Sequence, residues 1–177
     1  MMAYLSSESF VTGKAPNKSG NNHPILAPYG IFKTSDGEIA VAPASDKFCS
    51  IFLECIDLTN LLENELYKNN SNRMKNRDSL NEIVNKRMIS ETSDFWIKKL
   101  NKAGCPAAKI VSLPEALNSQ LIQDNEMVIS SNGPEGRQIK MTGFPVKLSD
   151  TPSQLYRHPP LLGEHTNEIL KTIKNNG

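Results

Sequence analysis

The chain has 177 residues, enough for one domain with a hydrophobic core or for a smaller domain with appendages. Its 20 basic and 19 acidic residues nearly cancel, so overall charge gives no argument for binding nucleic acid or an anionic membrane surface. Apolar runs stay well below the ~20 residues of a membrane span, and the first ten residues lack the pattern of a secretory signal, so a cytoplasmic location is expected.

The first 28 residues are expected to be a linker and a ligand-facing loop, the tail of a preceding domain. A helical remnant is indicated by Met2, Leu5, Ser9 and Phe10. Gly, Asn, Ser and Lys then dominate residues 12–22, and such a polar stretch buries too little apolar surface to fold by itself.

A β-hairpin is predicted next, between a run that ends at Thr34 and one that begins at Glu38. The Asp36-Gly37 pair between them is a strong hairpin signal, because Gly37 can take the positive φ that the turn needs. Ser45 can then cap a helix with one buried face at the spacing i, i+3, i+4, i+7, i+8. The residues of that face are Phe48, Ile51, Phe52, Cys55 and Ile56.

Two longer helices are predicted after a short helical piece and a loop over residues 59–72. The first covers roughly 73–89, and its inward residues are Leu80, Ile83, Val84 and Met88. Its basic residues are interpreted as a solvated face rather than a phosphate site. They are Arg73, Lys75, Arg77, Lys86 and Arg87.

The second of these two helices begins at Ser93, with Trp96, Ile97 and Leu100 inward. Gly104 suits its left-handed C-terminal position, and Pro106 prevents continuation.

The next part of the chain has strong local signals. Residues 107–111 are typical of a short strand. Ser112 and Glu115 form a capping box, which predicts a short helix as far as about Asn118. Two β-prone runs then flank a Gly/Pro-rich turn over residues 132–136, which predicts a second hairpin.

An extended arm is predicted over residues 143–160, because its four prolines prevent regular structure. A short closing helix is expected over Glu164–Lys171, and its apolar face carries Ile169, Leu170 and Ile173. So small an amphipathic helix needs a surface on which to dock.

The element order predicts an α+β fold. We expect a small domain over residues 29–142, with a β-hairpin, several helices and a second hairpin. Residues 143–177 then form an extended return arm and a C-terminal helix.

The metal-binding residue types are poorly placed for a metal site. His23, His158 and His165 are far apart and lack the spacing of metal ligands. The odd number of cysteines and the lack of a CxxC motif argue against a disulfide framework or a thiolate metal site. Buried free thiols are therefore expected at Cys49, Cys55 and Cys105.

The sequence also gives little support for catalysis by its own residues. It contains no GxSxG, GxGxxG or P-loop motif, so a hydrolase elbow, a dinucleotide fold and a P-loop are unsupported. Asp36 lies in the hairpin turn, and Asp46 and Asp94 lie at helix starts, where backbone N–H groups hold carboxylates ionised. A nucleophilic carboxylate needs a protected and oriented setting, so no catalytic aspartate is predicted here.

Several motifs occur in a fixed order over nearly the whole chain. They are Gly20-Asn21-Asn22-His23-Pro24, Leu26-Ala27-Pro28-Tyr29-Gly30-Ile31-Phe32, Asp36-Gly37, Trp96 with Ala103-Gly104-Cys105-Pro106-Ala107, Phe144-Pro145-Val146-Lys147-Leu148-Ser149 with Thr151-Pro152, and Pro159 to Thr166. Any one is weak, but the ordered set resembles the class III (CaiB/BaiF) CoA-transferases.

The resemblance implies an enzyme that moves CoA from an acyl-CoA to a free carboxylic acid, with coenzyme A as part of the substrate and no covalently bound cofactor. In the family an aspartate attacks the donor thioester and forms a mixed anhydride. That aspartate lies in a large N-terminal domain, and no position here matches its motif. We therefore expect the C-terminal part of such an enzyme, inactive alone, with no catalytic residue of its own.

The resemblance also implies a site. In the family a Gly-Asn-x-His-Pro segment approaches the active site, and Gly20 to Pro24 matches it. Asn21, Asn22 and His23 are therefore predicted to lie near the substrate, where a loop can exclude water from the reacting thioester. The alternative is a solvated linker with His23 packed against the hairpin.

The family's interlocked dimer implies either a homodimer or a complementary large-domain chain as the partner. Neither nucleic acid nor a membrane is an expected partner. Two other functions remain open, an acyl-CoA racemase of the same fold and a non-catalytic assembly module from a split or truncated gene.

Overall fold

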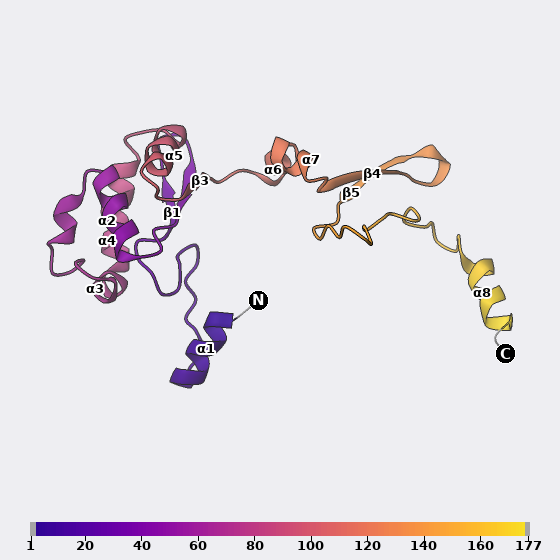
Figure 1. Ribbon diagram of the computed structural model, residues 1–177, viewed down its shortest axis with the longest axis horizontal. Helices are drawn as coiled ribbons and strands as arrows, with labels where there is room; N and C mark the ends of the chain where they lie inside the picture. The colour runs from indigo at the N-terminus through magenta and orange to yellow at the C-terminus, as the bar shows by residue number, and fades with distance from the viewer. Residues whose placement is uncertain (1–2, 176–177) are drawn as a thin grey trace. The chain divides into compact units, whose positions relative to one another are not determined.

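The computed structural model describes residues 3–175 and divides the chain into two units, Met1–Ile110 and Val111–Gly177 (Figure 1). Helices and small antiparallel sheets make up both units, so the α+β class is confirmed. The division comes earlier than the boundary at residue 142 expected from the sequence. The reason is that the second hairpin forms its own two-stranded sheet instead of joining the first sheet.

The first unit begins with helix α1 (Ala3–Thr12), which confirms the helical segment at Leu5, Ser9 and Phe10. Met2, which the same pattern included, lies outside the described residues. Residues 13–29 form neither helix nor strand and lead into the first sheet.

The first sheet has three antiparallel strands in the order β1 (Gly30–Lys33), β2 (Glu38–Val41) and β3 (Ala107–Lys109). The predicted hairpin is confirmed, because Lys33 pairs with Glu38. The expected reason for its turn was wrong, since Gly37 is not among the glycines with positive φ.

Contacts with a distant segment hold this turn instead. The Asp36 carboxylate accepts hydrogen bonds from the Ser93 backbone N–H at 2.7 Å and from the Thr34 hydroxyl at 3.1 Å. The Ser35 N–H donates to the Glu91 carbonyl oxygen at 2.9 Å. These bonds lower the pKa of Asp36, the Ser93 N–H being the main cause. The structural role expected for Asp36 is thus confirmed.

Helix α2 (Asp46–Cys55) begins at Ser45, whose hydroxyl accepts from the Phe48 N–H as predicted. Its buried face is rotated slightly from the predicted one. The fully buried residues on and just after the helix are Cys49, Phe52, Leu53 and Ile56. Phe48, Ile51 and Cys55 are only half-buried. The rotation turns Phe52 toward the sheet, where its ring lies 5.8 Å from that of Phe32.

The single helix expected over residues 73–89 is two helices. After a short 3-10 turn η1 (Thr59–Leu62), α3 (Asn70–Lys75) and α4 (Arg77–Met88) are separated only by Asn76. The predicted apolar face of α4 is confirmed, with Leu80, Val84 and Met88 buried and Ile83 half-buried.

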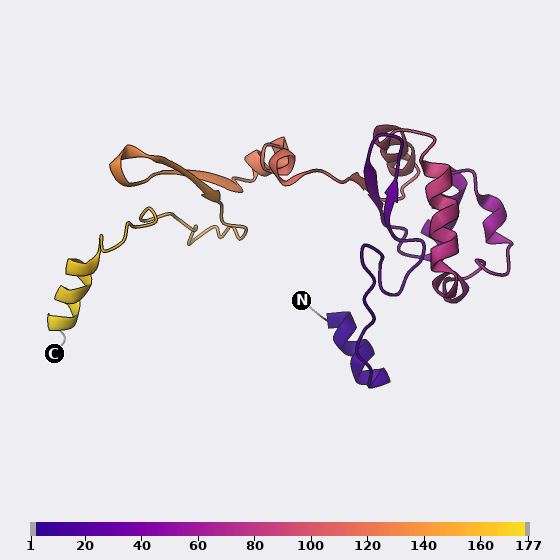
Figure 2. The same cartoon turned by 180° about the vertical axis from the view of Figure 1, so that it is seen from behind.

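Helix α5 (Ser93–Lys102) follows Thr92, whose hydroxyl caps it. Gly104 has φ 84°, as expected for its left-handed position. Trp96 is fully buried and donates from its indole Nε1 to the Met88 carbonyl oxygen at 2.7 Å. Helices α4 and α5 contact the sheet, and α2 packs against α5, so the core of the first unit lies between helices and sheet (Figure 2).

The second unit confirms the local predictions. The Ser112–Glu115 capping box starts α6 (Leu113–Leu117), and strands β4 (Val128–Asn132) and β5 (Gln138–Thr142) form the second hairpin. Two further elements were not predicted, α7 (Gln120–Asp124) and the 3-10 turn η2 (Pro134–Gly136).

The arm and the closing helix complete this unit. Residues 143–165 contain no helix or strand. The closing helix α8 (Thr166–Asn175) begins two residues later than expected. Its apolar side chains are exposed, and they are Ile169, Leu170 and Ile173.

Candidate functional site

The predicted substrate loop is held in a defined conformation. Gly20 has φ 56°, and the Asn22 N–H donates to the Ser19 carbonyl oxygen at 3.0 Å, which closes a turn. The His23 N–H donates to the Tyr29 carbonyl oxygen at 2.9 Å, so the two ends of the segment 23–29 lie together. Backbone bonds of this kind distinguish the segment from a solvated linker.

The three predicted site residues are adjacent but differ in environment. Asn21 is exposed, and Asn22 and His23 are half-buried. The His23 ring stacks on that of Tyr29, with 4.6 Å between centroids, and its Nδ1 accepts from the Ile25 N–H at 3.3 Å. His23 thus packs next to the hairpin. This contact was expected from the alternative interpretation, in which the segment is a solvated linker.

The loop lies directly on the first residue of β1. A Cβ atom at Gly30 would be 2.8 Å from Asn22 Oδ1 and 2.9 Å from the Asn21 carbonyl oxygen. Real Cβ contacts are not this short, so a glycine lets the loop approach the strand.

A row of polar side chains on α3 and α4 binds this loop and the segment that leads from it to β1. We call it the loop-binding stripe, and it consists of Asn70, Arg73, Arg77 and Asn81. Its spacings of three and four residues place all four on one face of the two helices. The prediction that Arg73 and Arg77 lie on a solvated face is wrong. Arg73 is 2% exposed and Arg77 is half-buried.

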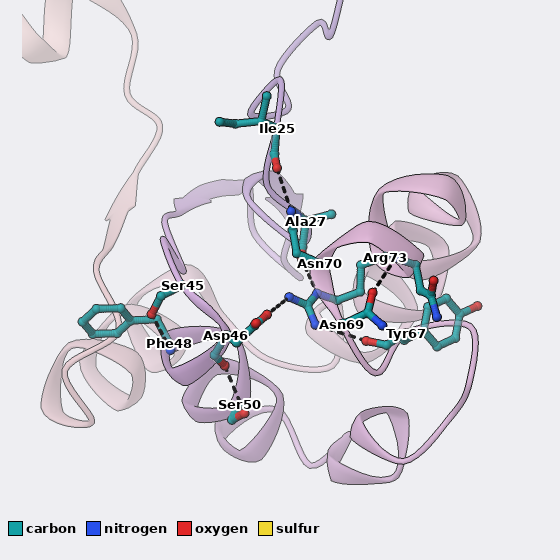
Figure 3. A network of polar contacts seen from close by, with 11 residues as sticks. Ile25, Ala27, Ser45, Asp46, Phe48, Ser50, Tyr67, Asn69, Asn70 and Arg73 are labelled. Carbon is teal, nitrogen blue, oxygen red and sulfur yellow. Dashed lines mark hydrogen bonds and ion pairs between the residues drawn. The ribbon is translucent and has the colours of Figure 1, made fainter. Parts of the chain in front are cut away.

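Arg73 is the most buried member of the stripe (Figure 3). Its Nε donates to the Ala27 carbonyl oxygen at 2.5 Å, and its Nη1 donates to the Tyr67 carbonyl oxygen at 3.1 Å. Its Nη2 forms an ion pair with the Asp46 carboxylate. The guanidinium fork therefore satisfies three acceptors that lie far apart in the sequence.

Asn70 holds the same part of the loop in a second way. Its Nδ2 donates to the Ile25 carbonyl oxygen at 2.8 Å, and its Oδ1 accepts from the Ala27 N–H at 3.1 Å (Figure 3). A side-chain amide used as both donor and acceptor fixes the path of a backbone segment, much as a neighbouring strand would.

The remaining members bind the predicted site itself. Arg77 Nη2 donates to the His23 carbonyl oxygen at 2.7 Å. Asn81 Nδ2 donates to Asn22 Oδ1 at 3.0 Å. One turn beyond the stripe, Asn85 Oδ1 accepts from the N–H of Lys33 in β1 at 2.9 Å. The 3-4-4 spacing of the stripe was visible in the sequence, but only the fold reveals what it binds.

The local electrostatics favour a neutral His23. Partial burial and, second, the positive charge of Arg77 lower the pKa of His23 below its ordinary value of 6.5. Since Nδ1 accepts a hydrogen bond, the neutral ring carries its proton on Nε2. The loop thus places an imidazole donor beside two asparagine side chains.

A cavity of about 480 Å³ lies beside the loop, lined by Glu8 of α1, by residues 16–19 and Pro24, and by residues 74–79 at the junction of α3 and α4. Asn21, Asn22 and His23 are not among its lining residues. Its charged lining residues are Glu8, Lys18, Lys75, Arg77 and Asp78. The two signs of charge offer partners for both donor and acceptor groups of a polar molecule.

Within residues 3–175, no group of three or more His, Cys, Asp or Glu side chains is arranged to hold a metal ion. Among the same residues, no helix is long and apolar enough to cross a membrane. Burial raises the pKa of Cys49 to about 11 and that of Cys105 to about 12, so these thiols are poor nucleophiles.

Comparison with known proteins shows one consistent relationship. A family model described as CoA-transferase family III matches residues 1–166. Succinyl-CoA:glutarate CoA-transferase of Homo sapiens is 28% identical over 172 residues, which is 97% of this chain and 39% of that protein. Acetyl-CoA:oxalate CoA-transferase of Acetobacter aceti is 30% identical over 138 residues, covering 78% of this chain and 34% of that protein.

Solved structures agree with this relationship. A CaiB/BaiF family protein from Brucella suis has a TM-score of 0.73 at 26% identity, over 98% of this chain and 44% of that chain. The chain spans about two fifths of the length of the curated relatives that it matches.

Proposed function

The chain belongs to CoA-transferase family III, and from that premise we propose that it forms part of an enzyme that transfers CoA from an acyl-CoA to a free carboxylic acid. The family match over residues 1–166 is the observation that carries this proposal. The relatives named above are transferases, which favours CoA transfer over the racemase reaction.

The nucleophile of the proposed reaction comes from outside these 177 residues. Three aspartates of the first unit already have structural partners: Asp36 accepts from Ser93, Asp46 pairs with Arg73, and Asp57 pairs with Arg87. A carboxylate held in this way is a poor nucleophile. The chain matches about two fifths of the length of its relatives. We infer that a large domain corresponding to the rest of that length supplies the nucleophile.

The proposed chemistry is acyl exchange without redox change. An enzyme carboxylate attacks the carbonyl carbon of the donor thioester, and the C–S bond breaks to give a mixed anhydride and CoA thiolate. The thiolate attacks the enzyme's carbonyl in that anhydride and releases the donor acid, which leaves an enzyme–CoA thioester. The acceptor carboxylate then repeats the sequence in reverse and leaves as its CoA ester, which restores the enzyme carboxylate.

This chain contributes the loop that covers the reacting groups. We assign Asn21, Asn22 and His23 to substrate contact, because the loop-binding stripe holds Asn22 and His23, and Asn21 directly precedes them. A covered site excludes water, which would otherwise hydrolyse the anhydride. The amide NH₂ groups of the asparagines can donate to carbonyl or carboxylate oxygens of the substrate, and the neutral imidazole of His23 lies next to them in the loop.

The acceptor class proposed for this chain is a dicarboxylic acid. The names of its relatives specify succinyl-CoA with glutarate, acetyl-CoA with oxalate, and succinyl-CoA with mesaconate. The test therefore uses succinyl-CoA and acetyl-CoA as donors with these three acids as acceptors.

The experiment combines this chain with the large domain of the Homo sapiens relative, both as a mixture and as a single fusion. We expect no CoA ester of the acceptor from either part alone, and its formation from the combined parts, measured by liquid chromatography. A stable complex without transfer would favour the assembly-module alternative and overturn the proposed activity. Turnover by this chain alone that depends on one of its own aspartates would overturn the assignment of the nucleophile.

A further inference from the structure

We propose that Asn81 is a positioning residue that acts through Asn22. By donating to Asn22 Oδ1, it turns the Asn22 NH₂ group toward the substrate, where that group can bind a carbonyl or carboxylate oxygen. The inference rests on the proposed function for its substrate, but the orientation of Asn22 can be measured without any activity.

Asn22 is held from three directions. Its backbone N–H donates to the Ser19 carbonyl oxygen at 3.0 Å, and its Oδ1 accepts from Asn81 Nδ2 at 3.0 Å. Gly30 lies against the third side, so close that an added Cβ would be 3.3 Å from Asn22 Cα. These contacts leave the side chain little freedom to change its direction.

The bond from Asn81 decides which end of the amide faces outward. The oxygen and nitrogen of a side-chain amide point in different directions, and an oxygen bound to α4 sends the NH₂ group away from that helix. Among residues 3–175, Asn22 Nδ2 has no hydrogen-bond partner, and Asn22 is only half-buried. The group that remains for a substrate is therefore a donor.

Stability gives no reason for an asparagine at position 81. Its Oδ1 is buried and has no hydrogen-bond partner among the described residues, and the same is true of Arg77 Nε one turn earlier. Buried unpaired polar atoms are unfavourable, and a leucine of similar size would avoid the first of them.

The substitution Asn81→Asp tests the orientation directly. A carboxylate at position 81 can only accept, so Asn22 must rotate its NH₂ group inward, and its oxygen then faces the substrate. The new carboxylate can also pair with Arg77, four residues earlier, so the fold is preserved. Asn85→Asp is the matched control, because Asn85 lies one turn further along α4 and already acts as an acceptor, for the Lys33 N–H in β1.

The first measurement uses this chain by itself. We expect exchange of the Asn22 side-chain NH₂ protons with water, followed by NMR, to slow at least fivefold in Asn81→Asp and to stay unchanged in Asn85→Asp. The urea midpoints of both variants should match that of the wild type. An unchanged exchange rate in a folded Asn81→Asp chain would overturn the proposal.

The second measurement uses the chain combined with the large domain. We expect kcat/KM to fall at least tenfold in Asn81→Asp, to fall less in Asn81→Leu, where the Asn22 amide can rotate freely, and to remain unchanged in Asn85→Asp. An active enzyme that is insensitive to Asn81→Asp would overturn the substrate role. If the wild-type combination is inactive, the proposed function fails, while the exchange data still decide whether Asn81 orients Asn22.

Discussion

Arg73 donates a hydrogen bond from Nε to the carbonyl oxygen of Ala27 at 2.5 Å, across 46 residues of sequence. This bond joins α3 to the loop that precedes β1. Since the same guanidinium also binds the Tyr67 carbonyl oxygen and the Asp46 carboxylate, one buried side chain fixes three segments of the first unit. The loop that carries the predicted site residues therefore depends on a residue outside that loop.

Replacement of Arg73 by Met should destabilise the first unit by about 3 kcal/mol, because two carbonyl oxygens lose their buried donor. Arg73→Lys should recover less than half of this loss, since an ammonium group cannot reproduce the planar fork. The free energy of unfolding in urea measures both effects. Lys68→Met, at an exposed ion pair with Glu65, is the control and should change stability little. Equal effects of Arg73→Met and Lys68→Met would contradict the structure.

The lowered pKa of His23 predicts how stability depends on pH. Between the folded pKa and the ordinary value of 6.5, the unfolded chain binds more protons at this position than the folded chain does. The contribution of His23 to stability is therefore complete above pH 6.5 and is lost as the pH falls through this window.

The variant Arg77→Gln removes one cause of the shift, so it should raise the pKa of His23, as measured by NMR titration of the imidazole protons. Lys75→Gln is a suitable control, because Lys75 is a base in the same part of the chain and is not among the causes of the shift. If both variants leave the His23 titration curve where it was, Arg77 does not act on this ring.

The features that the sequence predicted well are those with local causes. The capping box at Ser112 and Glu115 and the left-handed Gly104 each depend on residues within one turn of chain. The hairpin at Asp36 formed as expected, but its turn is held by Ser93, a contact that no local rule contains. Local chemistry thus predicted the caps and turns whose partners are close in the sequence.

The candidate site depends instead on contacts between segments that lie far apart in the sequence. The motif resemblance selected Asn21, Asn22 and His23, but the residues that hold them were hidden, because a basic side chain on a helix usually faces water. Arg73 is buried only because three acceptors from other segments converge on it. Periodicity describes which residues share a face, and the fold decides what that face meets.

The cysteines should differ in reactivity. Burial raises the pKa of all three thiols, that of Cys49 to about 11 and that of Cys105 to about 12. Cys55 differs in being only half-buried, so a reagent can reach it more easily. We expect slow labelling by a disulfide reagent at pH 8, with Cys55 reacting at least tenfold faster than the other two. Mass spectrometry of labelled peptides identifies the site. Cys55→Ser should remove the faster phase, and urea should make all remaining thiols react rapidly.

The close approach of the loop to β1 gives a final prediction. In Gly30→Ala the new methyl group would lie 2.8 Å from Asn22 Oδ1 and 2.9 Å from the Asn21 carbonyl oxygen, so the loop must move away. Such overpacking should cost about 1–3 kcal/mol of stability. The His23 N–H, which donates to the Tyr29 carbonyl oxygen, should then exchange faster with water.

Gly37→Ala is the matched control in the same hairpin, since its methyl group would meet only the Ser93 hydroxyl oxygen at an ordinary 3.7 Å. We expect it to change stability by no more than about 0.5 kcal/mol. The two variants add the same methyl group to neighbouring parts of one sheet, so a difference between them isolates the contact with the loop. Wild-type exchange at His23 in Gly30→Ala would mean that the loop does not rest on the strand, and the support proposed for Asn22 would fail with it.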